Sequence, residues 1–341
     1  MTGYDRIKNV LLDGVSDRTP TMLHNFMAAA EEKKYTMGEF RKSPEKIART
    51  FIDYSRKYDL DGILVDIDTC VESHAIGVPT DFPEDAPARN HGAIKGGIDA
   101  CIEAMDPKKI RKDERANIVA EAVHLIKKEV DGELFLRGNA DQGPFSLAML
   151  SYGMSEFMMA LMDEEMKPKI KTLMDRALEV HLEYHKMLFE AGADMTSFGD
   201  SSCGPDLISA DMYREFALPY HKKIAKILND MNILNLCHVC GNTDLIIEDL
   251  ASAGFSAVEI DYKTDIVKAQ KILKDKAVLF GPIDPSGIFY FGSPEDLKRE
   301  TKKVMDIFEG KGIVIGAGCA LPTGVPEANV RAFMDTVKNY S

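Results

Sequence analysis

The 341-residue sequence contains no tryptophan, and none of its apolar runs approaches the length of a membrane span. A transmembrane helix needs about 20 consecutive apolar residues, so we expect no membrane-spanning segment. Basic residues are in the minority, since 42 Lys and Arg stand against 55 Asp and Glu for a formal net charge of −13. That balance argues against a partner made of nucleic acid or anionic lipid.

Cysteine is also scarce, with six residues at irregular spacings. A secreted disulfide scaffold would need a denser and more regular set. The first residues, Met1–Arg6, lack the apolar core of a signal peptide. We therefore expect a protein of the reducing cytoplasm.

Hydrophobic residues make up 45% of the chain, enough for one large α/β domain or two smaller ones. No linker, low-complexity stretch or short internal repeat marks a boundary. We therefore expect a single domain over residues 1–341, with its acidic residues spread over solvated helix faces.

Eight short apolar runs, most of them separated by a helical pattern, organise this domain. Apolar strands that alternate with helices predict a parallel sheet covered on both faces, and eight such units predict a (β/α)8 TIM barrel. An amphipathic helix at Tyr4–Asp13 precedes the runs as an N-terminal helical extension. The runs cover residues 21–25, 62–68, 134–139, 194–200, 233–240, 257–261, 277–281 and 312–316.

Polar residues follow the carboxyl ends of these runs, where barrel active sites are built. Loops are polar in any protein, but carboxylates, amides and metal ligands after every run are harder to obtain by chance. These residues are Asn25, Asp68, Asn139, Asp200, His238, Cys240, Asp261, Asp284 and Cys319. From this set and the neighbouring His24, we expect substrate contacts at His24, Asn25, Asn139 and Asp200.

His238 and Cys240 lie two residues apart at the end of one run, so an extended chain points both to the same side. A soft thiolate beside an imidazole suits zinc, and Cys319 is the expected third ligand. Most cysteines are small apolar packing residues, which is how we interpret Cys237 and the other three. We call His238, Cys240 and Cys319 the trio. Their position at strand ends instead favours a zinc site with an open fourth position.

The charge of this trio indicates the chemistry. Two thiolates and a neutral imidazole cancel the charge of Zn²⁺, so a thiol in the open position would lose its proton and still keep a nucleophilic sulfur. Such a centre activates a thiol more naturally than it polarises a carbonyl. Asp68 is a candidate catalytic base or an anchor for a ligand cation, although it could equally cap its own loop.

Nearly the whole chain resembles the uroporphyrinogen decarboxylase superfamily, which is a (β/α)8 barrel. Asp68 matches the aspartate that binds pyrrole in that family. The arginine-rich signature of the decarboxylase itself, RQAGRYLPE, has no counterpart between Met22 and Phe40, so decarboxylation is the least favoured activity. The resemblance is carried by Arg6, residues 17–20, 58–62 and 68–77, Gly143–Phe145, Tyr213–Tyr220 and Pro326–Ala332.

His238-x-Cys240 with the distant Cys319 resembles the zinc motif of cobamide-dependent methyltransferases of the methylcobamide:coenzyme M type. This resemblance implies methyl transfer between a corrinoid (methylcobamide) and a zinc-bound thiol. The corrinoid would be carried by a partner protein, because the chain shows no cobalamin-binding domain. An acidic residue near zinc is also implied, and Asp261 is the candidate, as a catalytic residue and as a fourth ligand.

Two other interpretations stay open. A related enzyme could take a methyl group from a methoxylated aromatic compound or an amine to the corrinoid, usually with different zinc ligands. A zinc-stabilised binding protein without catalysis would also keep the trio. The sequence does not indicate which thiol or methyl donor is used.

Overall fold

Seven parallel strands form one curled sheet in the computed structural model of the chain, which describes residues 1–340. The order β1-β4-β5-β6-β7-β8-β9 places each strand beside the next one along the chain. A two-stranded hairpin, β2 (Thr80–Asp81) and β3 (Arg89–Asn90), lies in the excursion after β1. The strands of the sheet are β1 (Gly62–Val65), β4 (Phe135–Gln142), β5 (Met195–Gly199), β6 (Leu234–Val239), β7 (Ala257–Ile260), β8 (Val278–Ile283) and β9 (Ile313–Ala317).

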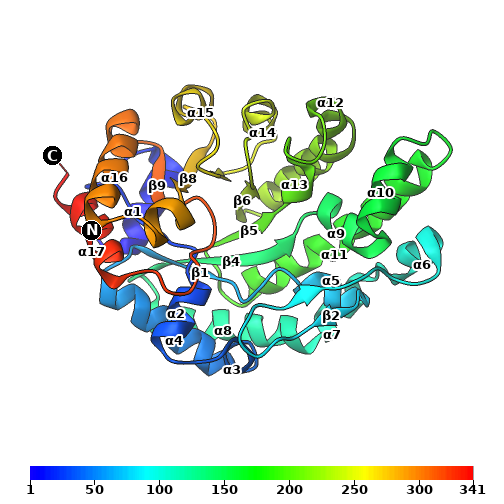
Figure 1. Cartoon of the computed structure of the whole chain (residues 1–341), viewed down its shortest axis with the longest axis horizontal. Helices are drawn as coiled ribbons and strands as arrows, with labels where there is room; N and C mark the ends of the chain where they lie inside the picture. The colour runs from blue at the N-terminus through cyan, green and yellow to red at the C-terminus, as the bar shows by residue number, and fades with distance from the viewer. Residues whose placement is uncertain (341) are drawn as a thin grey trace.

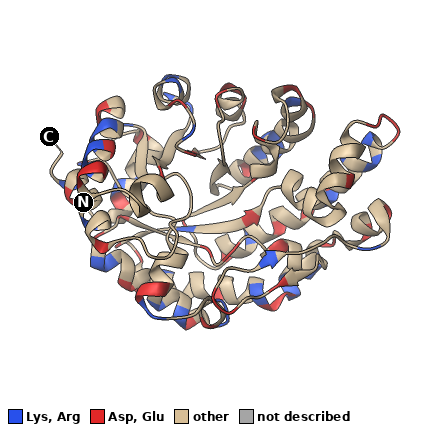
Figure 2. Cartoon of the chain, viewed as in Figure 1, with Lys and Arg blue, Asp and Glu red and all other residues tan. Residues whose placement is uncertain are grey.

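Helices surround this sheet (Figure 1), and acidic and basic residues are mixed along them (Figure 2), as expected for solvated faces. No helix of the described residues is long and apolar enough to cross a membrane. The helices are α1 (Gly3–Asp13), α2 (Phe26–Glu32), α3 (Met37–Phe40), α4 (Pro44–Tyr58), α5 (Val71–Ile76), α6 (Gly97–Ala104), α7 (Pro107–Lys112), α8 (Glu114–Val130), α9 (Pro144–Tyr152), α10 (Met154–Leu161), α11 (Lys167–Glu190), α12 (Ala210–Met212), α13 (Leu218–Asp230), α14 (Ile247–Ser252), α15 (Ile266–Leu273), α16 (Pro294–Phe308) and α17 (Glu327–Lys338), with short 3-10 or π segments at Ser201–Cys203, Tyr213–Ala217 and Pro285–Tyr290.

The first of the eight expected strands is reduced to a single bridge. Thr21 pairs in parallel with Ile315 of β9, and its carbonyl oxygen accepts a hydrogen bond of 3.1 Å from the amide of Asp61, just before β1. Pro20 has no amide hydrogen to donate, and Asn25 is already the N-cap of α2. The segment lies between the last and first strands, but the structure shows seven regular strands where the sequence predicts eight.

One hydrophobic cluster fills the inside of the curled sheet. All seven strands contribute to it, mostly with residues near their amino ends, and helix α1 adds two side chains that close that end. The carboxyl ends are therefore the open side of the sheet. The members are Ile7, Val10, Met22, Leu64, Phe135, Met195, Leu236, Ala257, Val278, Phe280 and Val314.

A buried carboxylate joins α1 to the place where the sheet closes. Asp61, whose residue is 1% exposed, accepts hydrogen bonds from Arg18 (2.7 Å) and Arg6 (3.1 Å) and from the amide of Thr21 (2.9 Å). Arg6, Arg18 and Asp61 all belong to segments that carry the family resemblance. Their shared role here is to hold the first segment against β1.

Replacing Asp61 by asparagine would leave two arginines beside a neutral buried group. We expect the free energy of unfolding in urea to fall by about 3 kcal/mol, as when one partner of a buried ion pair is removed. Asp59→Asn is the matched control: Asp59 is exposed, pairs with Lys338 at the surface, and has a positive φ that asparagine tolerates. Equal losses in the two variants would contradict the role of Asp61.

Candidate functional site

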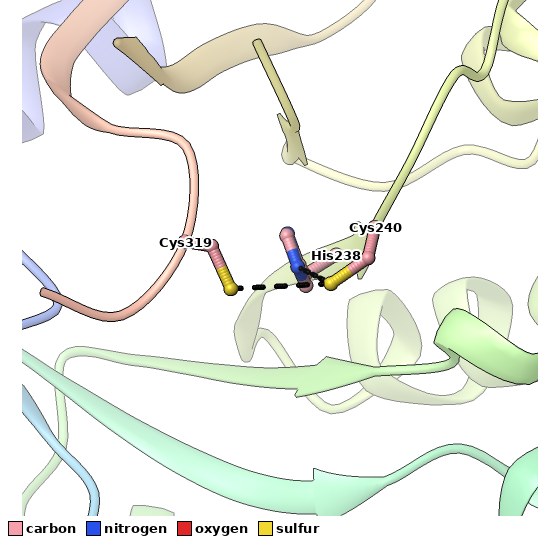
Figure 3. A group of neighbouring side chains, drawn as sticks. All are labelled: His238, Cys240 and Cys319. Carbon is pink, nitrogen blue, oxygen red and sulfur yellow. Dashed lines mark hydrogen bonds between the residues drawn. The ribbon is translucent and has the colours of Figure 1, made fainter. Parts of the chain in front are cut away.

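The three candidate ligands converge at the carboxyl ends of the strands (Figure 3). Nε2 of His238, in β6, lies 2.9 Å from Sγ of Cys240, and that sulfur lies 3.9 Å from Sγ of Cys319 beyond β9. All three donor atoms lie within 4.8 Å of one another. Two sulfurs on one tetrahedral zinc, each about 2.3 Å from the metal, are about 3.8 Å apart. The donor set therefore fits zinc in its chemistry and in the spacing of its two sulfurs, while Nε2 of His238 lies at hydrogen-bond distance from Cys240 and would move slightly apart to share a metal.

The ring of His238 is oriented by Glu259 on the neighbouring strand β7. Nδ1 lies 3.2 Å from the backbone carbonyl oxygen of Glu259 and 3.3 Å from its carboxylate. Nδ1 therefore carries the hydrogen that is donated, so in the neutral ring that a metal would require the lone pair of Nε2 lies on the side of Cys240. This is the arrangement by which outer partners fix the tautomer of a metal-binding histidine.

Glu259 is itself paired with Arg137 of β4 inside the sheet. Arg137 also donates to the hydroxyl of Ser197 on β5 (2.8 Å). Burial alone would raise the pKa of Glu259, but the charges of Arg137, His238 and His24 hold that pKa below its ordinary value. Sequence reasoning missed both Arg137 and Glu259. Each is a lone charge within an apolar run, and two such charges of opposite sign are a signal for a buried pair.

These residues form one layer on the inside of the sheet. Side chains alternate along a strand, and each member lies two residues after a member of the interior apolar cluster: Arg137 follows Phe135, for example, and His238 follows Leu236. We call this set the polar layer. Its members are His24, Asp66, Arg137, Ser197, His238 and Glu259.

The two sulfurs of the trio differ in acidity. The hydrogen bond from Cys319 and the charge of His238 outweigh burial and lower the pKa of Cys240 to about 3. The same hydrogen bond, together with burial, raises the pKa of Cys319. Burial lowers the pKa of His238, but the charges of Cys240 and Glu259 outweigh it and raise that pKa to about 9. Without metal, one thiolate therefore lies between an imidazolium and a thiol.

Asp261 follows β7 and lies beside the trio, but its carboxylate is not among the three donor groups that converge. Its Oδ2 accepts the amide of Gly241 (3.0 Å), next to Cys240, while its Oδ1 is buried with no hydrogen-bond partner among residues 1–340. An unpartnered buried oxygen is costly unless a cation or donor occupies it. Gly318 packs on this strand end, where a Cβ would lie 3.2 Å from the Cα of Asp261. The turn that presents Cys319 therefore depends on glycine.

Asp68 lies just beyond β1 and is paired within the protein. One carboxylate oxygen accepts a hydrogen bond from Arg115 of α8, and the other accepts the amide of Cys70 (2.9 Å). These contacts agree with the loop-capping alternative. A catalytic or ligand-anchoring role for Asp68 stays a prediction, and its charge is already balanced by Arg115, which the sequence did not single out.

Asp200 is fully buried and has partners for both oxygens. Oδ1 accepts the amide of Ser146 (2.8 Å), and Oδ2 lies 3.2 Å from Nε2 of His221, whose Nδ1 meets the hydroxyl of Tyr213 (2.9 Å). Asp200, His221 and Cys203 form a second group of possible metal donors, all buried. The predicted contact of Asp200 with substrate stays untested, and its surroundings favour a structural role.

The other predicted contacts lie closer to the open end. His24 belongs to the polar layer and pairs with Asp66 (2.8 Å). Asn25 is buried at the start of α2. Asn139, half-buried in β4, accepts a hydrogen bond from Ser197 (3.1 Å) and is thereby linked to Arg137. Sequence reasoning missed Asp66 because it chose Asp68, the next acidic residue along the chain.

In metal-free protein, iodoacetamide should modify Cys240 before Cys319, as followed by peptide mass spectrometry. Because the pKa of Cys240 is lowered, its sulfur stays ionised as the pH falls from about 8 to about 6, and its rate should change little. A free thiol with a pKa of about 8.5 loses most of its rate in that range. Cys319→Ala removes the hydrogen bond that lowers this pKa most, and His238→Gln removes the neighbouring positive charge, so each should restore a steeper dependence. A decline as steep as that of free glutathione would contradict the assignment.

The whole chain is similar to one protein family and to several known proteins. The family described as "Uroporphyrinogen decarboxylase (URO-D)" matches residues 2–340. The methylcobamide:CoM methyltransferase MtbA of Methanosarcina acetivorans is 29% identical over 285 residues, which are 80% of this chain and 81% of the relative. A uroporphyrinogen decarboxylase of Chlorobium phaeobacteroides is also 29% identical, over 311 residues, 88% of this chain and 86% of the relative.

A solved structure described as a methyltransferase from Methanosarcina mazei superposes with a TM-score of 0.90 at 21% identity, covering 100% of this chain and 99% of that one. A B12-independent methionine synthase from Shewanella reaches a TM-score of 0.56 at 11% identity, covering 95% and 94% of the two chains. At these identities the structures show a shared fold only. The methyltransferase and the decarboxylase named above are equally identical to this chain, so sequence identity alone does not decide between the two activities.

Proposed function

The chain belongs to the uroporphyrinogen decarboxylase (URO-D) family, and within this family we propose that it is a zinc- and corrinoid-dependent methyltransferase. The methyl group moves between a corrinoid (methylcobamide) bound to a partner protein and a small thiol such as coenzyme M. The whole chain, 1–341, acts as one domain of the (β/α)8 type, in the cytoplasm. The observation that carries this proposal is the convergence of His238, Cys240 and Cys319 at the open ends of the strands.

The site favours methyl transfer over decarboxylation. Relatives with both names match equally well in identity, so the distinction rests on the residues themselves. A porphyrinogen carries many carboxylates, yet no arginine occurs between Met22 and Phe40, where the decarboxylase has its arginine-rich signature. Asp68, the residue that would hold pyrrole nitrogens, is already paired with Arg115. Two cysteines at the strand ends also have no role in removing carboxylates.

Each residue near the trio has a distinct task in this proposal. His238, Cys240 and Cys319 hold zinc, and Asp261, with its unpartnered oxygen, is the candidate fourth ligand. When bound, zinc would supply the positive charge that makes a substrate thiol acidic at neutral pH. Glu259 keeps the lone pair of His238 Nε2 on the side of Cys240. Arg137 balances the charge of Glu259 so that the layer as a whole stays buried.

The purified protein should hold about one zinc per chain, measured by inductively coupled plasma mass spectrometry. Cys240→Ala and Cys319→Ala should each lose most of it, because only two of the three protein donors remain. Cys237→Ala is the matched control, since Cys237 points to the opposite side of β6 and is buried in the cluster under the helices. Full zinc in both ligand variants would contradict the assignment.

With methylcobalamin as donor, coenzyme M or homocysteine should be methylated, followed by the absorbance change of the cobalamin. Cys319→Ala should abolish this transfer, and uroporphyrinogen should give no coproporphyrinogen. Decarboxylation at ordinary enzyme concentrations would overturn the proposal. If thiols are inert while a methoxylated aromatic compound or a methylated amine transfers its methyl group to the corrinoid, the enzyme performs the opposite half-reaction.

A further inference from the structure

A histidine–carboxylate pair lies in the polar layer, on the segments beside β9. His24 comes from the segment that bridges β9 and β1, and Asp66 follows β1 directly. Nε2 of His24 lies 2.8 Å from Oδ2 of Asp66. Because Nε2 donates its hydrogen to this carboxylate, Nδ1 carries the free lone pair. We call His24 and Asp66 the dyad.

The dyad faces the same space as the trio. Thr21 pairs with Ile315, so the segment that carries His24 runs beside β9, which leads into Cys319. The backbone oxygen of His24 also accepts the amide of Leu321 (2.7 Å), two residues after Cys319. On the other side, His24 lies close enough to Glu259 for a proton on its ring to lower the pKa of that carboxyl group, and Glu259 contacts His238.

His24 is also within reach of a ligand. Its side chain is 16% exposed, whereas those of Arg137 and Glu259 in the same layer are 3% and 5% exposed. Its ring rests on that of Phe26, with centroids 5.5 Å apart. Phe26 and Asp66 therefore hold the ring in place, while part of it stays exposed.

In the proposed reaction the substrate thiol releases a proton, which another group must accept. A neutral thiol has to lose its hydrogen before its sulfur can attack a methyl group. The lone pairs of the trio are directed at the metal, and the nearby carboxylates of Asp68, Asp200 and Glu259 are paired with Arg115, His221 and Arg137. Asp261 is the candidate fourth ligand. The dyad offers a lone pair, on a partly exposed ring, that is committed neither to a metal nor to an arginine.

We propose that the dyad takes the proton of the substrate thiol, with His24 as the catalytic base and Asp66 as its positioning residue. This inference rests on the proposed function. The S–H bond breaks and its electron pair stays on sulfur, while an N–H bond forms at Nδ1 of His24. The carboxylate of Asp66 stabilises the resulting imidazolium through the hydrogen bond at Nε2 and holds the ring in its tautomer. The proton then passes from Nδ1 to water.

The test uses the protein with cobalt(II) in place of zinc, mixed with coenzyme M in a stopped-flow spectrometer. A sulfur-to-cobalt charge-transfer band reports binding of the deprotonated thiol without any methyl donor. We expect His24→Ala to slow the appearance of this band about 100-fold, the usual size of a general-base contribution. Asp66→Asn should slow it less, and free imidazole should restore much of the rate in His24→Ala alone.

The controls separate catalysis from folding. His91→Ala changes an exposed histidine of the β2–β3 hairpin and should bind thiol at the normal rate. His24→Ala should keep its full cobalt content, since His24 is not a ligand. His24→Gln, which fills the same space without a basic nitrogen, should be slow and should not respond to imidazole.

The outcomes are distinguishable. If His24→Ala binds the thiol as fast as the unmodified protein, or is slow without any rescue by imidazole, the role of the dyad is overturned and the proposed function stands. If the unmodified protein shows no charge-transfer band with coenzyme M or homocysteine, the proposed function fails, and the dyad proposal fails with it.

Discussion

The buried ion pair between Arg137 and Glu259 is the interaction on which the site depends. It joins β4 to β7 across the inside of the sheet, one layer above the apolar cluster and next to His238. Removing two charges from water is expensive, and a buried pair often adds little net stability compared with apolar residues. The hydroxyl of Ser197 and the face of Phe280, 5.5 Å from the guanidinium carbon, compensate part of that cost. What the pair provides in return is a fixed orientation for the imidazole of His238.

The trio was predictable because two simple rules apply at the end of β6. Residues two apart on an extended chain share a side, and parallel strands present their carboxyl ends together. Cys319 was found by the second rule alone, since it follows another apolar run. Seven of the eight expected strands were found by the same apolar pattern. The first run failed because hydrophobicity does not reveal that Pro20 and the start of α2 leave room for only one bridging residue.

The polar layer was missed for a different reason. Polar residues after the strands were the candidates, whereas Arg137 and Glu259 lie within the strands, two residues beyond apolar members of the interior cluster. The choice of Asp68 over Asp66 came from the same attention to residues after the strands, and the role of Asp68 stays a prediction. β1 ends at Val65, so Asp66 continues the alternation of the strand, while Asp68 lies in a turn where its direction depends on contacts that only the folded chain defines.

The bridge between Thr21 and Ile315, which we call the seam, joins the first segment to the last strand. It also sets the order in which the site can be assembled. His24, Asp66, His238 and Cys240 are all synthesised before Cys319, which reaches them only when β9 has docked on both β8 and the first segment. A growing chain therefore exposes two donors of the trio for as long as the ribosome needs to complete β9. Chains fold progressively from the amino end during synthesis, and two donors hold a metal far more weakly than three. In the proposed zinc site, the full set of three donors would therefore form only after the seam has closed.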